Sequence, residues 1–148
     1  MSKVSDDQET LRRLILELRI LEGSAGELQA RLNVLNAFSN ELQLASATLE
    51  GLREEKSGIE VLLPVGGGSY VRAKVDKPKK VLVGVGAGIS IEKDKDQAIE
   101  SLQEQRNQLE SANQSLQQQA AQVLQKISET RTQINSLSRK MSEGTQSV

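Results

Sequence analysis

Residues 58–93 read GIEVLLPVGGGSYVRAKVDKPKKVLVGVGAGISIEK, and this stretch decides how the rest of the chain is arranged. Polar and apolar residues alternate along it, and glycines cluster at 66–68 and again at 84–88. Alternation with a period of two predicts β-strands, and glycines between two such strands predict a tight hairpin turn. We therefore predict two β-hairpins, one from strands at 59–63 and 69–75 and one from strands at 81–85 and 88–92.

The predicted hairpins have one apolar side and unprotected edges. Val71 and Val75 alternate with Arg72 and Lys74, which indicates a sheet with one dry face. Pro78 and its lysine neighbours are predicted to link the two hairpins. Two hairpins alone are only marginally stable in water, and free strand edges pair readily with other strands. We therefore interpret this middle segment as an assembly surface.

On both sides of the hairpins, leucine-type residues recur every three and four positions, which is the a/d seam of a coiled coil. Each arm would be about 75 Å long as a helix. We expect arm helices at 5–57 and 94–143, the hairpin segment at 58–93, and flexible termini at 1–4 and 144–148. The seam residues are Val4, Leu11, Leu14, Leu18, Leu21, Ala25, Leu28, Leu32 and Leu35 in the first arm, and Ile99, Leu102, Leu109, Leu116, Ala120, Val123, Ile127, Ile134, Leu137 and Met141 in the second.

A chain that turns back between two equal seams can join them, so the predicted class is α+β. The expected architecture is a long antiparallel coiled-coil helical hairpin with two β-hairpins at its base. Two alignments bring a positions level with d positions. A first alignment places Leu21 level with Ile127, and a second, displaced by seven residues, places Leu28 level with Ile127. The sequence does not choose between them.

The arms contain three irregularities, of which the first, a pair of glycines, lies outside the seam. Gly23 and Gly26 weaken the first helix by roughly 1 kcal/mol each. After Leu35 the apolar residues step to Phe38, Leu42, Ala45, Leu49 and Leu52, which resembles a stammer that overwinds the coil locally. Arg106 and Asn113 occupy seam positions in the second arm, where they either fix the register or form an unremarkable polar layer.

The composition excludes several classes of function. Aromatic residues make up 1% of the chain, which is too little for a usual globular core. Because cysteine and histidine are both absent, thiolate chemistry and the commonest general base are excluded. No apolar run reaches the roughly 20 residues that span a bilayer, and the polar start is no signal peptide. A net charge of −1 gives no general attraction to nucleic acid or membrane. We expect a cytoplasmic protein without enzymatic activity.

Several motifs have ordinary explanations. The glycines at 84–88 alternate inside a strand pattern and open no helix, so they predict a turn and not a nucleotide-binding loop. The carboxylates between 92 and 96 suit a solvated helix start better than a metal site. The lysines between 77 and 80 have no aromatic residues beside them for base stacking. We therefore predict no cofactor and no metal.

The first arm carries apolar residues outside its seam. Ile15, Leu16 and Ile20 are predicted to face outward near the end of the arm, and Leu44 also lies off the seam. A cluster of exposed apolar residues usually marks contact with another molecule. Packing on a neighbouring helix, or simple tolerance of the exposure, would explain the same pattern.

The order of elements and two phrases, VGGGSYVRAK at 65–74 and VGVGAGISIEK at 83–93, resemble the α-type subunits of the prefoldin family. The resemblance covers nearly the whole chain. Two hairpins favour the α type over the β type, which has one. Gly67 replaces the alanine usual in the first phrase, which changes little beyond the flexibility of the turn.

The resemblance implies an ATP-independent chaperone, a holdase. Two α and four β subunits (α2β4) would join their hairpins into an oligomeric β-barrel, and the arm tips would hold unfolded polypeptide and deliver it to a group II chaperonin. Carried onto this sequence, the client-binding residues are Leu11, Leu14, Ile15, Leu18, Ile134, Leu137 and Met141. The assembly residues are Val61, Leu63, Val71, Val75, Val83, Val85, Ile89 and Ile91. The alternatives are a structural coiled-coil tether and a nucleic-acid-binding helical hairpin, although the arms have no basic stripe.

Overall fold

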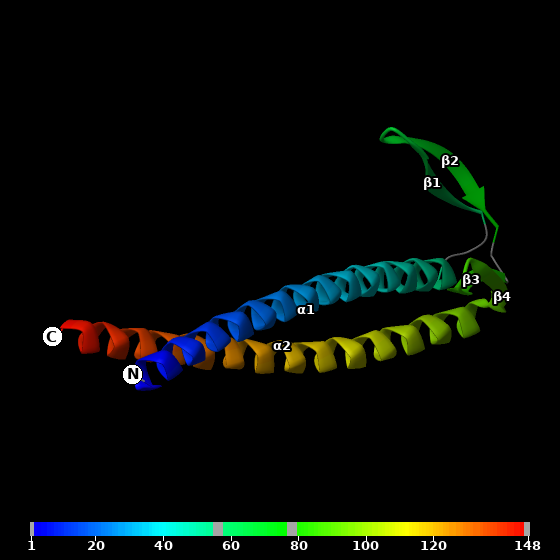
Figure 1. The fold of residues 1–148 in the computed structure, drawn as a ribbon. Coiled ribbons are helices and arrows are strands. Elements are labelled where there is room, and N and C mark those ends of the chain that lie inside the picture. Colours follow the sequence, from blue (N-terminus) through cyan, green and yellow to red (C-terminus); the bar gives the residue numbers. More distant parts are fainter. Residues whose placement is uncertain (1, 55–57, 77–79, 147–148) are drawn as a thin grey trace. The chain divides into compact units, whose positions relative to one another are not determined.

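The computed structural model describes residues 2–54, 58–76 and 80–146, and it contains two long helices with two β-hairpins between them (Figure 1). The predicted architecture of helix, double hairpin and helix is confirmed. The predicted link at Pro78 lies outside the described residues. The elements are α1 (Ser2–Glu54), β1 (Ile59–Gly66), β2 (Ser69–Val75), β3 (Lys80–Gly86), β4 (Ile89–Asp94) and α2 (Lys95–Gln146).

The helices reach further toward the chain ends than the expected ranges. α1 includes residues 2–4 and α2 includes residues 144–146, although the sequence pattern predicts flexible termini there. The chain divides into two compact units. Unit 1 is Met1–Asn36 with Ser111–Val148, and unit 2 is Ala37–Glu110.

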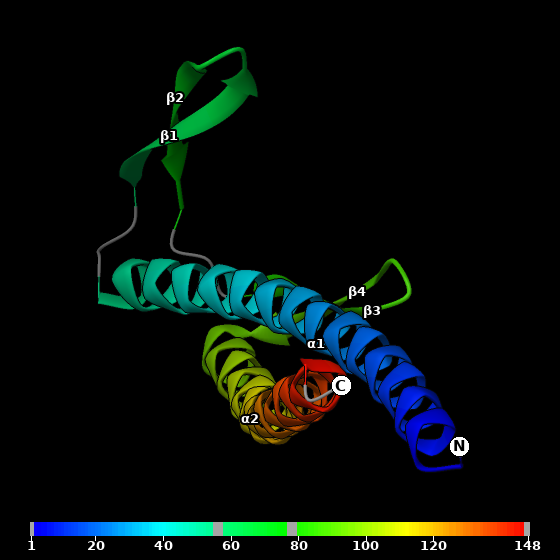
Figure 2. The same cartoon turned by 60° about the vertical axis from the view of Figure 1, so that its left-hand side comes forward.

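In unit 1, segments of α1 and α2 run antiparallel and share a narrow apolar stripe (Figures 1 and 2). Leu14, Leu28 and Leu32 of α1 and Ile127 of α2 are each less than a tenth exposed, as is Thr130. Each such apolar side chain stabilises the pair by about 1.5–3 kcal/mol. Away from the stripe the helices are mostly polar, which is the distribution expected of a two-helix coil, with a few exposed apolar residues such as Val4, Leu16 and Leu124.

A hydrogen bond between the helices identifies their alignment. The side-chain amide of Asn113 donates to Oδ1 of Asn36 over 2.7 Å. Asn36 would be level with Ala112 in the first alignment and with Gln119 in the second. Because Asn113 directly follows Ala112, this contact favours the first alignment. The 2.8 Å ion pair of Arg131 with Glu22 is compatible with it only because two long side chains bridge an offset of five residues.

The predicted stammer is wrong. Phe38 is 54% exposed, whereas Ser39 is half-buried and Ser46 is 8% exposed. The buried positions of α1 therefore continue at Ser39, Leu42, Ser46 and Leu49, with the 3,4 spacing unbroken. The 3,4 spacing of the helix determines which positions of α1 face α2, and serine occupies two of these positions, 39 and 46. An apolar pattern alone had pointed to the neighbouring Phe38 and Ala45.

Both hairpins share one turn design. β1 pairs antiparallel with β2, and β3 pairs antiparallel with β4, each pair forming a separate two-stranded sheet. Each ladder shifts register one residue before its turn, at Val65 and at Val85. The turn residues have positive φ, with 57° at Gly67 and 51° at Ala87. Successive positive φ values twist the backbone in the sense that suits a tight hairpin, and glycine adopts them without steric cost.

Candidate functional site

The most exposed apolar side chains of unit 1 include two at the N-terminal half of α1. Leu16 is 59% exposed and Ile20 is 70% exposed, while the neighbouring Ile15 is 37% exposed. Leu16 and Ile20 are one helical turn apart and therefore share a face. The prediction that these three residues face outward is confirmed. We call them the α1 apolar patch.

The residues predicted to bind clients lie mostly in or beside the seam. Leu14 is buried, with 8% of its surface exposed, because it packs toward α2. It belongs to the core of unit 1. Leu11, Leu18, Ile134, Leu137 and Met141 are half-buried at the same end of the coil.

Leu14 and Leu137 both line a shallow groove between the two helices. Its walls come from both helices, and most of the residues in them are polar. The groove is lined by Thr10, Arg13, Leu14, Thr132, Gln133, Ser136, Leu137 and Lys140. The structure thus brings the predicted client-binding residues of the two arms together, although most of their apolar surface is buried between the helices.

Leu16 and Ile20 were absent from the residues that the resemblance assigned to client binding. Their position outside the 3,4 spacing was the signal that identified them as exposed. Leu16 and Ile20 expose more surface than any of the assigned residues, and with Ile15 they form a cluster. The other exposed apolar residues of unit 1, Val4, Val34 and Leu124, occur singly along the sequence.

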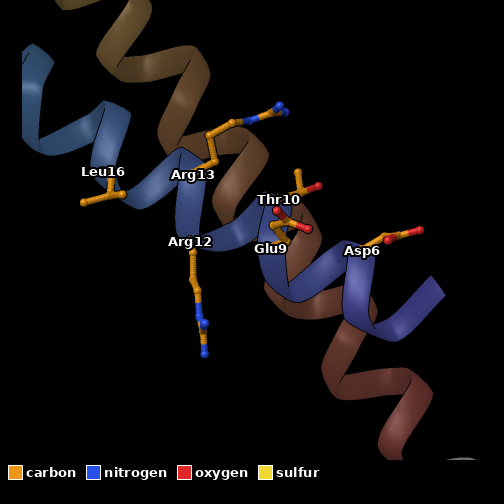
Figure 3. Close-up of a pocket in the computed structure, with 6 residues that line it drawn as sticks. All are labelled: Asp6, Glu9, Thr10, Arg12, Arg13 and Leu16. Carbon is orange, nitrogen blue, oxygen red and sulfur yellow. The ribbon is translucent and has the colours of Figure 1, made fainter. Parts of the chain in front are cut away.

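Charged side chains surround the α1 apolar patch and diverge from one another. Figure 3 shows Arg12 and Arg13 extending in different directions from α1, away from Glu9 and Asp6, with Leu16 on the same stretch of helix. This surface is an open hollow on one helix. Such an arrangement suits surface contact, since reacting groups in an active site converge on one point.

Within the described ranges, no group of three or more acidic side chains lies close enough together to hold a metal ion. Over the same ranges, neither helix has a segment long and apolar enough to cross a membrane.

The first hairpin presents an apolar face without cover. Leu63 pairs with Val71 across the two strands, and each is 51% exposed. Val61 and Val75 lie on the same face and are half-buried. The opposite face is polar in part, with the Arg72 guanidinium 3.2 Å from the Glu60 carboxylate.

The second hairpin differs because one side of it is already covered. Val83 is 6% exposed and lies at a groove that β3 forms with α1 and α2 of unit 2. Val83 therefore packs within its own chain, unlike the other residues predicted for assembly. Val85, Ile89 and Ile91 remain exposed, at 48%, 60% and 47%.

Comparison with known proteins gives consistent matches. Residues 21–140 match the family model described as Prefoldin subunit. Prefoldin subunit alpha of Methanopyrus kandleri is 38% identical over 111 residues, which cover 75% of this chain and 71% of that protein. Prefoldin subunit alpha 1 of Thermococcus kodakarensis is 35% identical over 100 residues, or 68% of each chain. The cryo-EM structure of filamentous PFD from Methanocaldococcus jannaschii matches with a TM-score of 0.66 at 30% identity, over 78% of this chain and 95% of that one.

Proposed function

Because the chain belongs to the prefoldin family of chaperone subunits, we propose that it works as an ATP-independent holdase subunit of the α type. In this proposal it captures unfolded polypeptide on the helical coil and passes it to a group II chaperonin in the cytoplasm. Neither cofactor nor metal takes part.

The α1 apolar patch carries the proposal. Leu16 and Ile20 expose more than half of their surface, although burying such a side chain is worth about 1.5–3 kcal/mol. Two or three contacts of this size give weak binding that tolerates many client shapes. Several arms acting together would raise the total affinity, and each weak contact would still allow release. Ile15, the third member of the patch, and the half-buried residues at the same end of the coil would extend the contact. These half-buried residues are Leu11, Leu18, Ile134, Leu137 and Met141.

The hairpins would assemble the oligomer. We propose that this chain joins β-type subunits in an α2β4 hexamer, in which the hairpins close into a β-barrel. The support is the uncovered apolar face of β1–β2 around Leu63 and Val71, together with the exposed Val85, Ile89 and Ile91 of the second hairpin. Val83 would instead tie the second hairpin to the helices of its own chain.

A holdase assay tests the proposal. The assembled protein should suppress light scattering by a denatured client enzyme, and a variant with Ile15→Ser, Leu16→Ser and Ile20→Ser should lose most of that protection. Leu44→Ser is the matched control, because Leu44 is 70% exposed on the same helix in unit 2. Native mass spectrometry should show that all variants still assemble. Equal protection by the triple variant and the wild type would contradict the assignment, and no protection by either would favour a structural tether.

A second mode of assembly has support from one comparison. The similar chain from Methanocaldococcus jannaschii is described as filamentous. Open-ended self-assembly of this chain would also cover its hairpin faces. Electron microscopy of the chain alone and with a β-type subunit distinguishes filaments from closed hexamers.

A further inference from the structure

We propose that the α1 apolar patch selects apolar client segments that are flanked by acidic side chains, an inference that rests on the proposed holdase function and adds a charge preference to it. The observation behind it is a set of three arginines around the patch. Arg12 and Arg13 lie one turn before Leu16, and Arg19 lies one turn after it. All three side chains are exposed.

These arginines, like Arg106 and Arg139 of α2, have no partner among the described residues, whereas three other arginines are paired. Arg31 pairs with Glu27 at 2.8 Å, Arg72 with Glu60 at 3.2 Å, and Arg131 with Glu22 at 2.8 Å. The guanidinium groups of Arg12, Arg13 and Arg19 make no ion pair or hydrogen bond within the described ranges. Their five N–H donors each are therefore available to an incoming carboxylate.

The local charge around Leu16 is positive even though the whole chain has a net charge of −1. At 100° per residue, Arg12, Arg13 and Arg19 fall within about 60° of the direction of Leu16. Glu9 is the one carboxylate that shares this face between residues 9 and 23, and Figure 3 shows Arg13 extending away from it. A client segment laid over Leu16 and Ile20 would thus bring its flanking side chains beside unpaired cations.

Charge complementarity of this kind changes affinity modestly and association rates more strongly. We expect an apolar peptide with acidic flanks to bind about 5-fold more tightly than its neutral counterpart at low salt. A peptide with lysine flanks should bind more weakly than the neutral one. The preference should fade as the Debye length shrinks from about 10 Å at 0.1 M salt to about 3 Å at 1 M.

Fluorescence anisotropy with three peptides of identical apolar core and acidic, neutral or basic flanks tests this inference on the assembled protein. Replacing Arg12, Arg13 and Arg19 together by glutamine should remove the preference, whereas replacing all three by lysine should keep most of it. The Leu16→Ser, Ile20→Ser variant should weaken all three peptides alike.

The possible results distinguish a failure of the charge preference from a failure of the proposed holdase function. Equal binding of acidic and basic peptides by the wild type at low salt would overturn the charge preference alone. A glutamine variant that keeps the preference would also overturn it. If no peptide binds the wild type, the holdase function fails and the preference with it.

Discussion

The hydrogen bond between Asn36 and Asn113 should select the alignment of the coil, and removing it should release the alternative. Moving to the second alignment displaces one helix by seven residues, or about 10 Å along its axis, which breaks this 2.7 Å contact. Because this hydrogen bond is exposed, it contributes about 0.5–1.5 kcal/mol to the alignment that forms it. A contribution of that size biases the two alignments by roughly 2- to 13-fold. The Asn36→Leu, Asn113→Leu variant should therefore populate both, and should also be more stable overall.

Engineered cysteines can report the alignment, because the chain has none of its own. A pair at Leu21 and Ile127 should form a disulfide only in the first alignment, and a pair at Leu28 and Ile127 only in the second. We expect the first pair to oxidise in the native background and both pairs to oxidise in the leucine background.

The matched control for this experiment is Asn33→Leu. Asn33 accepts a hydrogen bond from Gln29 of the same helix, so its loss should leave the alignment unchanged. If the leucine background gave the same ratio of disulfides as the native chain, the apolar layers alone would set the register and this reasoning would be refuted.

Three further substitutions have defined outcomes. Ser46→Ala should raise the free energy of unfolding by about 1–2 kcal/mol in a thermal melt, because Ser46 is buried and its Oγ has no hydrogen-bond partner among the described residues. The control is Ser111→Ala at an exposed position of α2, which should change the free energy of unfolding by a few tenths of a kcal/mol. Ala87→Gly should stabilise the second hairpin by roughly 0.5 kcal/mol, since φ at this alanine is 51°; a lower melting temperature would contradict this. Leu63→Lys should block assembly in native mass spectrometry, while lysine at Leu62, on the opposite face, should block it less.

The elements were predictable from the sequence because each rests on local patterns. Alternating residues and glycine turns located both hairpins, and the structure pairs β1 with β2 and β3 with β4 as expected. The seam of unit 1 was also predictable, since leucines at Leu14, Leu28 and Leu32 keep a strict 3,4 spacing. In these regions hydrophobicity and backbone geometry point to the same residues.

The remaining features depend on contacts that apolar patterns do not encode. Ser39 and Ser46 lie in the seam because helix geometry carries them there, so a search for apolar residues missed them. The register required a polar contact, because both alignments bury similar layers. Val83 and Leu63 are both apolar residues in strands predicted for assembly, but Val83 packs on the helices of its own chain.

The candidate site was predictable only in part for the same reason. The off-seam positions of Leu16 and Ile20 predicted their exposure directly. The resemblance instead assigned residues such as Leu14, whose burial in the coil became clear only from the packing of α1 on α2.

Site-specific photo-cross-linking tests most directly whether unfolded polypeptide binds at the α1 apolar patch. A photoreactive amino acid at position 16 or 20 of the assembled protein should capture a denatured client on irradiation. The same group at Leu124, which is 59% exposed on α2, should capture little. Equal capture at all three positions, or capture at 124 alone, would contradict binding at this patch.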